Sequence, residues 1–367
     1  MKMQLQFRFF RNKYLIIAVL AAITGLYFSM NVHTKSQKTI RNPELKTIKP
    51  DWRGNPLDED GLFMNHEYLA NNDFARVMKW QFETNPQKDE KKNDKFRLKV
   101  VDASAFLKDK RDGILWVGHA TFLMRIKGTV FITDPIFTVP AFMSKRFSKL
   151  PFNPDSLRNI DYILLSHDHY DHLNKESFKL LTKNNPGIKV LTSLRLGEFV
   201  EDWMNGNKYQ EAGWYQQYSM TPKDIKITYL PTRHWSKRGI NSMNTTLWGA
   251  FMIQTDTLSI YFGGDSGWGS HFKEVKELFG NPDYSIIGIG AYKPEWFMGP
   301  SHTSPGDGLK AAMQMSAKNL IPMHYGTFDI ADEPIGEPFR EVHRIYNEQY
   351  SGKFNLITPA IGEVIYF

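Results

Sequence analysis

The residues of this chain that could do chemistry are concentrated in one short segment, SHDHYDH at 166–172, directly after an apolar run at 161–165. Imidazole nitrogens and carboxylate oxygens are the ligands that zinc and similar divalent ions prefer. In an extended chain His167 and His169 project to the same side, while Asp171 and His172 follow the turn, where a second ion could bind. The alternative is a polar loop whose histidines cap the helix that follows. We favour a metal site because the full H-x-H-x-D-H pattern is far more specific than a lone H-x-H.

Three more metal-competent residues, His234, Asp265 and His324, each follow an apolar run typical of a strand. Strand ends converge on one edge of a layered fold, and functional residues gather on the loops there. Together with the first segment they make seven candidate ligands: His167, His169, Asp171, His172, His234, Asp265 and His324. One bridging carboxylate, for which Asp265 is the candidate, lets seven groups supply the eight contacts of two four-coordinate ions.

The elements that must position these residues begin near Arg97, where short apolar strands alternate with helices. We expect an α/β fold, a sandwich with sheets inside and helices outside. The predicted strands are 113–125, 129–133, 161–166, 189–193, 226–230, 246–254, 258–262, 284–289, 320–322, 354–357 and 363–367. The predicted helices are 175–183, 194–204, 271–279, 306–316 and 338–349.

The N-terminal part of the chain has a different texture. An uncharged apolar run at 14–28 follows four basic residues and indicates an uncleaved membrane anchor, or a cleaved signal segment as the second choice. The basic flank places the catalytic domain on the extracytoplasmic side. We therefore expect a signal-anchor at 1–32, a tether and extension with an amphipathic helix at 33–96 (helix 65–82, charged linker 85–95), and a catalytic domain at 97–367.

Composition excludes several classes of protein. The chain has 367 residues, of which 41% are hydrophobic and 14% aromatic, so a disordered protein is excluded. The absence of cysteine excludes disulfides, thiolate ligands and a cysteine nucleophile. The net charge of +7 owes four charges to the first thirteen residues, and no basic stripe follows, so we reject nucleic acid as a partner. The oligomeric state stays open.

Several further motifs accompany the ligands. They are GHATFL at 118–123, TDP at 133–135, HWSKR at 234–238, GGDSGW at 263–268, IGAYKPEWFM at 289–298 and MHYGTF at 323–328. With the ligand pattern, this set resembles the metallo-β-lactamase superfamily, whose fold is an αββα sandwich. Within it, the motifs are similar to the branch of phospholipase D enzymes that hydrolyse N-acylphosphatidylethanolamine, over residues 50–339.

The resemblance implies a division of the ligands between two zinc ions, although other divalent metals would also suit the site. His167, His169 and His234 would hold one ion, and Asp171, His172 and His324 the other, with Asp265 bridging. A hydroxide between the ions would attack a phosphodiester. Asp134, supported by His119, is our candidate for orienting the imidazoles. His302 would position the phosphate or protonate the leaving alkoxide.

The resemblance also implies a phospholipid substrate, reached from a membrane that the N-terminal segment binds. Aromatic side chains between the predicted strands could line its groove, although such clusters are more often core. The candidates are Trp214, Tyr218, Trp296 and Phe297. The expected products are phosphatidic acid and an N-acylethanolamine. The alternatives are a lactonase resembling ascorbate-6-phosphate lactonase and a non-catalytic, metal-stabilised binding domain displayed at the membrane.

Overall fold

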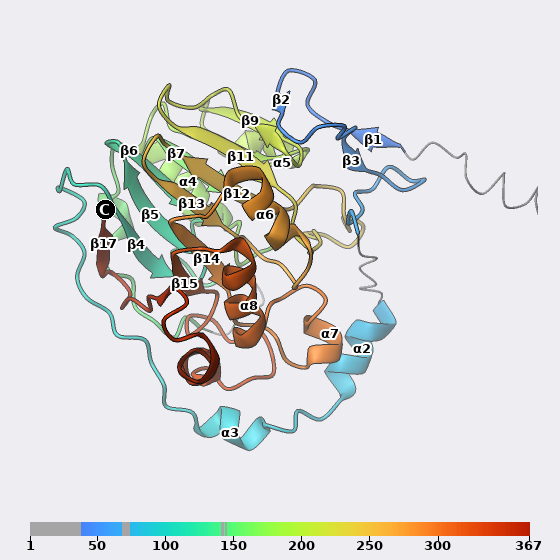
Figure 1. Ribbon diagram of the computed structural model, residues 1–367, viewed down its shortest axis with the longest axis vertical. Helices are drawn as coiled ribbons and strands as arrows, with labels where there is room; N and C mark the ends of the chain where they lie inside the picture. The colour runs from blue at the N-terminus through green and yellow to red at the C-terminus, as the bar shows by residue number, and fades with distance from the viewer. Residues whose placement is uncertain (1–37, 68–73, 141–142, 144) are drawn as a thin grey trace, which may run out of the picture. The chain divides into compact units, whose positions relative to one another are not determined.

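The computed structural model describes residues 38–67, 74–140, 143 and 145–367 (Figure 1). Thr39–Phe367 form one compact unit, built around two mixed β-sheets. The predicted anchor at 14–28 lies outside the described residues. Within the described ranges, no helix is both long and apolar enough to span a bilayer.

One sheet has seven strands, in which β17, β4, β5 and β6 are antiparallel and β6 to β9 are parallel. In order across the sheet, the strands are β17 (Val364–Tyr366), β4 (Gly113–Gly118), β5 (Thr121–Ile126), β6 (Thr129–Thr133), β7 (Tyr162–Leu165), β8 (Lys189–Ser193) and β9 (Lys208–Ala212). Side chains alternate between the faces of a strand. Tyr162 and Leu164 therefore enter the core between the sheets, and Ile163 and Leu165 enter a second core on the outer face.

The other sheet has eight strands and the same mixed character. Neighbouring strands are antiparallel from β2 through β10, β11 and β12 to β13, and they are parallel from β13 through β14 and β15 to β16. Its strands, in order, are β16 (Asn355–Leu356), β15 (Asn319–Met323), β14 (Tyr284–Gly288), β13 (Ser259–Phe262), β12 (Ala250–Gln254), β11 (Lys226–Leu230), β10 (Gln216–Gln217) and β2 (Lys46–Thr47). A small pair, β1 (Thr39–Ile40) and β3 (Asn55–Pro56), lies outside both sheets.

Helices cover both outer faces, so the predicted αββα sandwich is confirmed. α4 (Lys175–Asn184) and α5 (Leu196–Val200) pack on the seven-stranded sheet. α6 (His271–Phe279) and α8 (Pro305–Met315) lie side by side over the eight-stranded sheet (Figure 1). The remaining helices are α2 (Phe74–Phe82), α3 (Lys88–Asn93), α7 (Glu295–Met298) and α9 (Glu337–Ile345), with single turns at Pro154–Ser156, Glu201–Trp203 and Tyr346–Tyr350.

The N-terminal extension differs from the predicted tether. From Thr39 onward it packs on the sandwich, because β2 pairs with β10 and Leu45 is buried in the main core. Gln216 holds this segment with two reciprocal bonds: its Oε1 accepts from the Asn42 amide at 2.9 Å, and its Nε2 donates to the Asn42 carbonyl at 2.7 Å. The charged stretch predicted as a linker contains α3.

Candidate metal centre

The carboxyl ends of parallel strands bring the metal-competent residues together. β7 leads into the H-x-H-x-D-H segment, β13 leads through two glycines to Asp265, and β15 ends next to His324. In sheets of this kind ligands bind at the carboxyl ends of the strands. All seven candidate ligands meet at this edge. His119, in the turn between β4 and β5, joins them.

The first group of ligand atoms is a triangle of imidazoles. Nε2 of His167 lies 3.0 Å from Nδ1 of His169, and Nε2 of His234 lies 3.1 Å from the same atom. With a carboxylate oxygen of Asp265, these atoms all lie within 4.8 Å of one another. Ligands bound about 2.0–2.1 Å from a tetrahedral ion are about 3.3 Å apart. The group therefore has the dimensions of one metal site.

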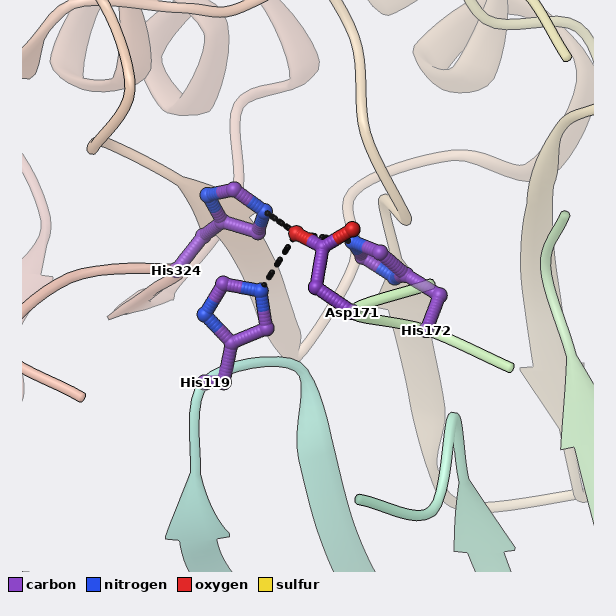
Figure 2. A group of neighbouring side chains, drawn as sticks. All are labelled: His119, Asp171, His172 and His324. Carbon is purple, nitrogen blue, oxygen red and sulfur yellow. Dashed lines mark hydrogen bonds and ion pairs between the residues drawn. The ribbon is translucent and has the colours of Figure 1, made fainter. Parts of the chain in front are cut away.

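The second group surrounds the carboxylate of Asp171 (Figure 2). Its Oδ2 atom lies 2.9 Å from Nε2 of His119, 3.4 Å from Nε2 of His324 and 3.7 Å from Nε2 of His172. The three imidazoles come from different strand ends and turn toward this one oxygen. His119, which the sequence placed only in a supporting role, thus lies close enough to Asp171 to fix its orientation.

Asp265 connects the two groups. Its Oδ1 lies 3.2 Å from Nε2 of His324, and its Oδ2 lies 3.1 Å from Nε2 of His172. The same Oδ2 is 3.7 Å from Nε2 of His234, in the first group. The carboxylate is 4% exposed and lies between both clusters. This is the position that a bridging ligand requires.

The electrostatics of the centre fit a cation. Burial opposes the ionisation of Asp265, but His172 and His324 hold the pKa of its carboxyl well below the usual range. Burial also opposes protonation of His324, but Asp265 and Asp171 raise the pKa of its imidazole to about 9. The buried carboxylates thus demand positive charge, which divalent ions would supply. Nε2 of His172 and Nε2 of His324 both face the carboxylates of Asp171 and Asp265, which is the direction in which a metal would lie.

Asp134 holds His172 from outside the centre. Its Oδ2 is 2.8 Å from Nδ1 of His172, and it also accepts from the Ser166 hydroxyl at 2.6 Å. Burial raises the pKa of Asp134, against the effect of neighbouring His172. The Ser166 hydroxyl lies 2.9 Å from Nδ1 of His167 as well. Asp134 thus lies where the predicted orienting residue must lie. The contact between Ser166 and His167 was not predicted, because nothing in the sequence indicates it.

His302 lies beside the centre, on the chain between α7 and α8. Its Nδ1 is 3.8 Å from Oδ2 of Asp265, and it forms a further ligand-competent group with Asp265 and His324. Burial lowers the pKa of His302 to about 4. This shift favours the uncharged imidazole at neutral pH, and the two predicted roles of His302, positioning the phosphate or protonating the leaving alkoxide, stay predictions. A neutral imidazole can still donate an N–H to a phosphate oxygen.

A cavity of about 710 Å³ opens onto the centre. Its polar end is formed by His169, Asp171, Asp265 and His302. Most of the remaining wall surface is apolar and comes from α2, α7 and two loops, through Val77, Trp80, Met143, Phe297, Met298 and Ile330. The charged side chains of Lys91, Lys237, Asp329 and Asp332 also line the cavity. An apolar cavity with a few convergent polar groups at one end is typical of a ligand site.

The predicted substrate contacts on α7 have different surroundings. Phe297 lines the cavity and stacks on Trp80, with ring centroids 5.1 Å apart. Trp296 instead packs under Lys79, whose Nζ lies 4.2 Å from the ring centroid, and it is not part of the cavity wall. The segment is a short helix, which turns these neighbouring side chains in different directions.

The prediction that Trp214 and Tyr218 line a substrate groove is wrong. Trp214 is fully buried in the core between the sheets, and its Nε1 donates to the Trp248 carbonyl at 2.7 Å. Tyr218 is 1% exposed in the same core, and its hydroxyl donates to the Thr192 carbonyl. Large aromatic side chains stabilise a core through their buried area, and their polar atoms then find backbone partners.

Comparisons with known proteins point the same way as the geometry. A model described as the beta-lactamase superfamily domain matches residues 129–325. A Caenorhabditis elegans protein named N-acyl-phosphatidylethanolamine-hydrolyzing phospholipase D 1 is 31% identical over 68% of this chain and 74% of its own length. The mitochondrial enzyme of the same name in Saccharomyces cerevisiae is 28% identical over 68% of this chain, which spans 54% of that relative. In fold, the chain is similar to a possible metal-dependent hydrolase from Veillonella parvula, with a TM-score of 0.56, 16% identity, and coverage of 70% of this chain and 100% of that one.

Proposed function

The chain belongs to the metallo-β-lactamase superfamily and is a metal-dependent hydrolase with a His/Asp metal site, and from this premise we propose the bond that it cuts. The proposed substrate is N-acylphosphatidylethanolamine, and the proposed products are phosphatidic acid and an N-acylethanolamine. One observation carries the proposal: Asp265 lies between two ligand groups, at the polar end of a cavity with apolar walls. The names of the nematode and yeast relatives support the same substrate.

The chain would divide its ligands between two ions. His167, His169 and His234 would hold one ion, Asp171, His172 and His324 would hold the other, and Asp265 would be shared. An imidazole-rich, cysteine-free set of this kind suits zinc. Ions bound there would supply positive charge to a phosphoryl oxygen and acidify a water molecule.

The remaining residues of the site would orient and enclose the substrate. His302, neutral and exposed to the cavity, would donate an N–H to a phosphate oxygen next to Asp265. The stacked rings of Trp80 and Phe297 would hold an acyl chain and keep water from that side of the cavity. Phosphate positioning at one end and apolar burial at the other together match a lipid phosphodiester.

We also propose that the N-terminal segment 1–32 holds the protein at a membrane, with the catalytic unit on the extracytoplasmic side. The apolar run at 14–28 and its basic flank support this arrangement. Full-length protein should sediment with membranes and resist extraction at high salt. Leu20→Lys, near the middle of the apolar run, should release it, and unchanged sedimentation of that variant would contradict the proposal.

Product analysis tests the proposed reaction. Full-length protein shown to contain metal is offered N-acylphosphatidylethanolamine in mixed micelles, with and without a chelator, and the products are identified by mass spectrometry. Phosphatidic acid and N-acylethanolamine in equal amounts, lost on chelation, are expected. Metal-loaded protein that releases neither product would overturn the proposal. Hydrolysis of a lactone by that protein would then favour the lactonase branch.

A further inference from the structure

His234 is a metal-competent residue without a regular element to hold it. It lies between β11 and β12, in residues 231–249, where the structure contains no helix or strand and only an isolated bridge from Arg233 to Gly267. A ligand must nevertheless be held close to its productive position for a metal site to work. Other parts of the chain must therefore fix this segment.

Asn65 forms two hydrogen bonds with the backbone of His234 itself. Its Nδ2 donates to the His234 carbonyl at 2.8 Å, and its Oδ1 accepts from the His234 amide at 3.2 Å. The side chain of Asn65 is buried, at 8% exposure. Both halves of the carboxamide are thus used on one residue. Asn65 lies in the N-terminal extension, upstream of the residues 129–325 that match the family model.

Asp168 holds the same segment at other residues, Lys237, Arg238 and Thr246. Its carboxylate, at 2% exposure, accepts from the Lys237 amide at 3.0 Å and from the Thr246 hydroxyl at 3.1 Å. Its carbonyl accepts from Nη1 of Arg238 at 2.7 Å. Since Asp168 lies between His167 and His169 in the sequence, these bonds connect the two segments that carry the first ligand group.

The ring of His234 is oriented separately. Its Nδ1 lies 3.0 Å from the Ser301 carbonyl, which leaves Nε2 directed toward His169. An outer hydrogen bond of this kind fixes which nitrogen of a histidine faces a metal. With the ring oriented in this way, the position of the His234 backbone decides where Nε2 lies.

We propose that Asn65 and Asp168 are positioning residues that clamp the His234 segment and thereby set the affinity of the His167, His169 and His234 group for its ion. The inference rests on the two-ion site of the proposed function. It makes part of the N-terminal extension, outside the matched domain, a component of the metal centre. The hydrogen bonds of Asn65 and Asp168 described above all go to the His234 segment, and none of them goes to the second group, around Asp171.

Metal stoichiometry and affinity test the proposal. Full-length wild type, Asn65→Ala and Asp168→Ala are equilibrated in buffered zinc, and bound metal is measured by mass spectrometry and by competition with a chromogenic chelator. The wild type should bind two ions. In each variant one ion should bind about 10–100-fold more weakly, as is usual when an outer partner of a ligand is lost, while the other ion is retained. Asp168→Asn, which keeps one acceptor and the side-chain size, should show the smaller loss.

Two matched variants control for general destabilisation. Asn55→Ala removes a fully buried carboxamide from the same extension, where Asn55 accepts from the Trp214 amide at 3.1 Å. Asp283→Ala removes a carboxylate that accepts from the amide and hydroxyl of Ser259, at 2.8 and 3.0 Å. Both should bind two ions with wild-type affinity.

The outcomes separate this inference from the proposed function. If the wild type binds two ions and the clamp variants match it, or if the control variants lose an ion to the same extent, the clamp is contradicted while the proposed function stands. If folded wild type binds fewer than two ions, the two-ion site fails and the clamp fails with it. Circular dichroism and cooperative unfolding identify the folded protein in each case.

Discussion

Nδ1 of His172 lies 2.8 Å from Oδ2 of Asp134, while Nε2 on the other side of the same ring lies 3.1 Å from Oδ2 of Asp265. A fully buried carboxylate outside the centre thus determines which nitrogen of His172 faces the ligand group. Outer carboxylates of this kind also raise the basicity of the histidine that they contact. The Thr-Asp-Pro turn that ends β6 therefore contributes to the metal centre without entering it.

Asp134→Asn should lower metal affinity by about 10–100-fold, with a parallel loss of kcat/KM. An amide keeps the shape of the side chain and one acceptor oxygen, but it carries no negative charge, and its NH2 group cannot accept from the Ser166 backbone amide as Oδ1 of the carboxylate does, at 2.8 Å. Chelator competition measures the metal affinity, and turnover at saturating metal measures any loss of kcat/KM that remains when both ions are bound. Unchanged affinity in the folded variant would show that Asp134 only stabilises its turn.

In its proposed role His302 contacts the substrate phosphate rather than the metals, so His302→Gln should lower turnover by about 100-fold or more with both ions retained. Metal content and kcat, measured on one preparation, check this. Loss of one ion would instead make His302 a ligand.

Because burial lowers the pKa of His302 to about 4, its charge does not change between pH 6 and 9. The variant and the wild type should therefore have parallel pH–rate profiles in that range. If the rate of the wild type rises or falls with pH there and the rate of the variant does not, His302 changes its charge in that range and does not act only as a neutral hydrogen-bond donor.

Trp80→Ala should reduce kcat/KM for long-chain substrates by about 10-fold, since an apolar wall of the cavity is lost. A short-chain, water-soluble phosphodiester should be cleaved at the wild-type rate. Phe82→Ala is the matched control, because Phe82 lies on the same helix but is 81% exposed and outside the cavity. Equal losses on long and short substrates would mean that Trp80 supports the metal centre rather than an acyl chain.

Trp214→Ala should lower the free energy of unfolding by about 3–5 kcal/mol, as is usual for removal of a large aromatic side chain from a core. Denaturant unfolding measures the change. At a temperature where the variant remains folded, its KM should equal that of the wild type, because Trp214 is buried between the sheets rather than exposed to the cavity. A raised KM with unchanged stability would restore the groove assignment.

The local pattern of the sequence was sufficient to predict the sandwich and to select seven candidate ligands that the fold brings together. Strands such as β7 and β13 are short apolar runs, and the residues that follow them include His167 and Asp265, so strand ends and ligands are visible together. The convergence of strand ends then follows from the layered architecture. No knowledge of long-range pairing is needed for either step.

Features that depend on distant partners could not be predicted in this way. β2 is two residues long and exists because β10, about 170 residues later, pairs with it. Aromatic clusters look alike in a core and in a groove, so Trp214 was misplaced. The backbones of His119 and His324 adopt positive φ angles, 54° and 64°, which nothing in their sequence neighbourhood indicates. Such strained positions persist where the surrounding structure enforces them and are frequent at functional sites.

The most direct test of the central claim is the fate of oxygen from water. Metal-loaded protein is incubated with N-acylphosphatidylethanolamine in ¹⁸O-labelled water, and the products are analysed by mass spectrometry. Attack at phosphorus by a water molecule activated at the metal centre predicts one ¹⁸O atom in the phosphate of phosphatidic acid and none in the N-acylethanolamine, with all labelling lost after chelation. Label in the N-acylethanolamine, or labelled fatty acid from ester cleavage, would contradict the account.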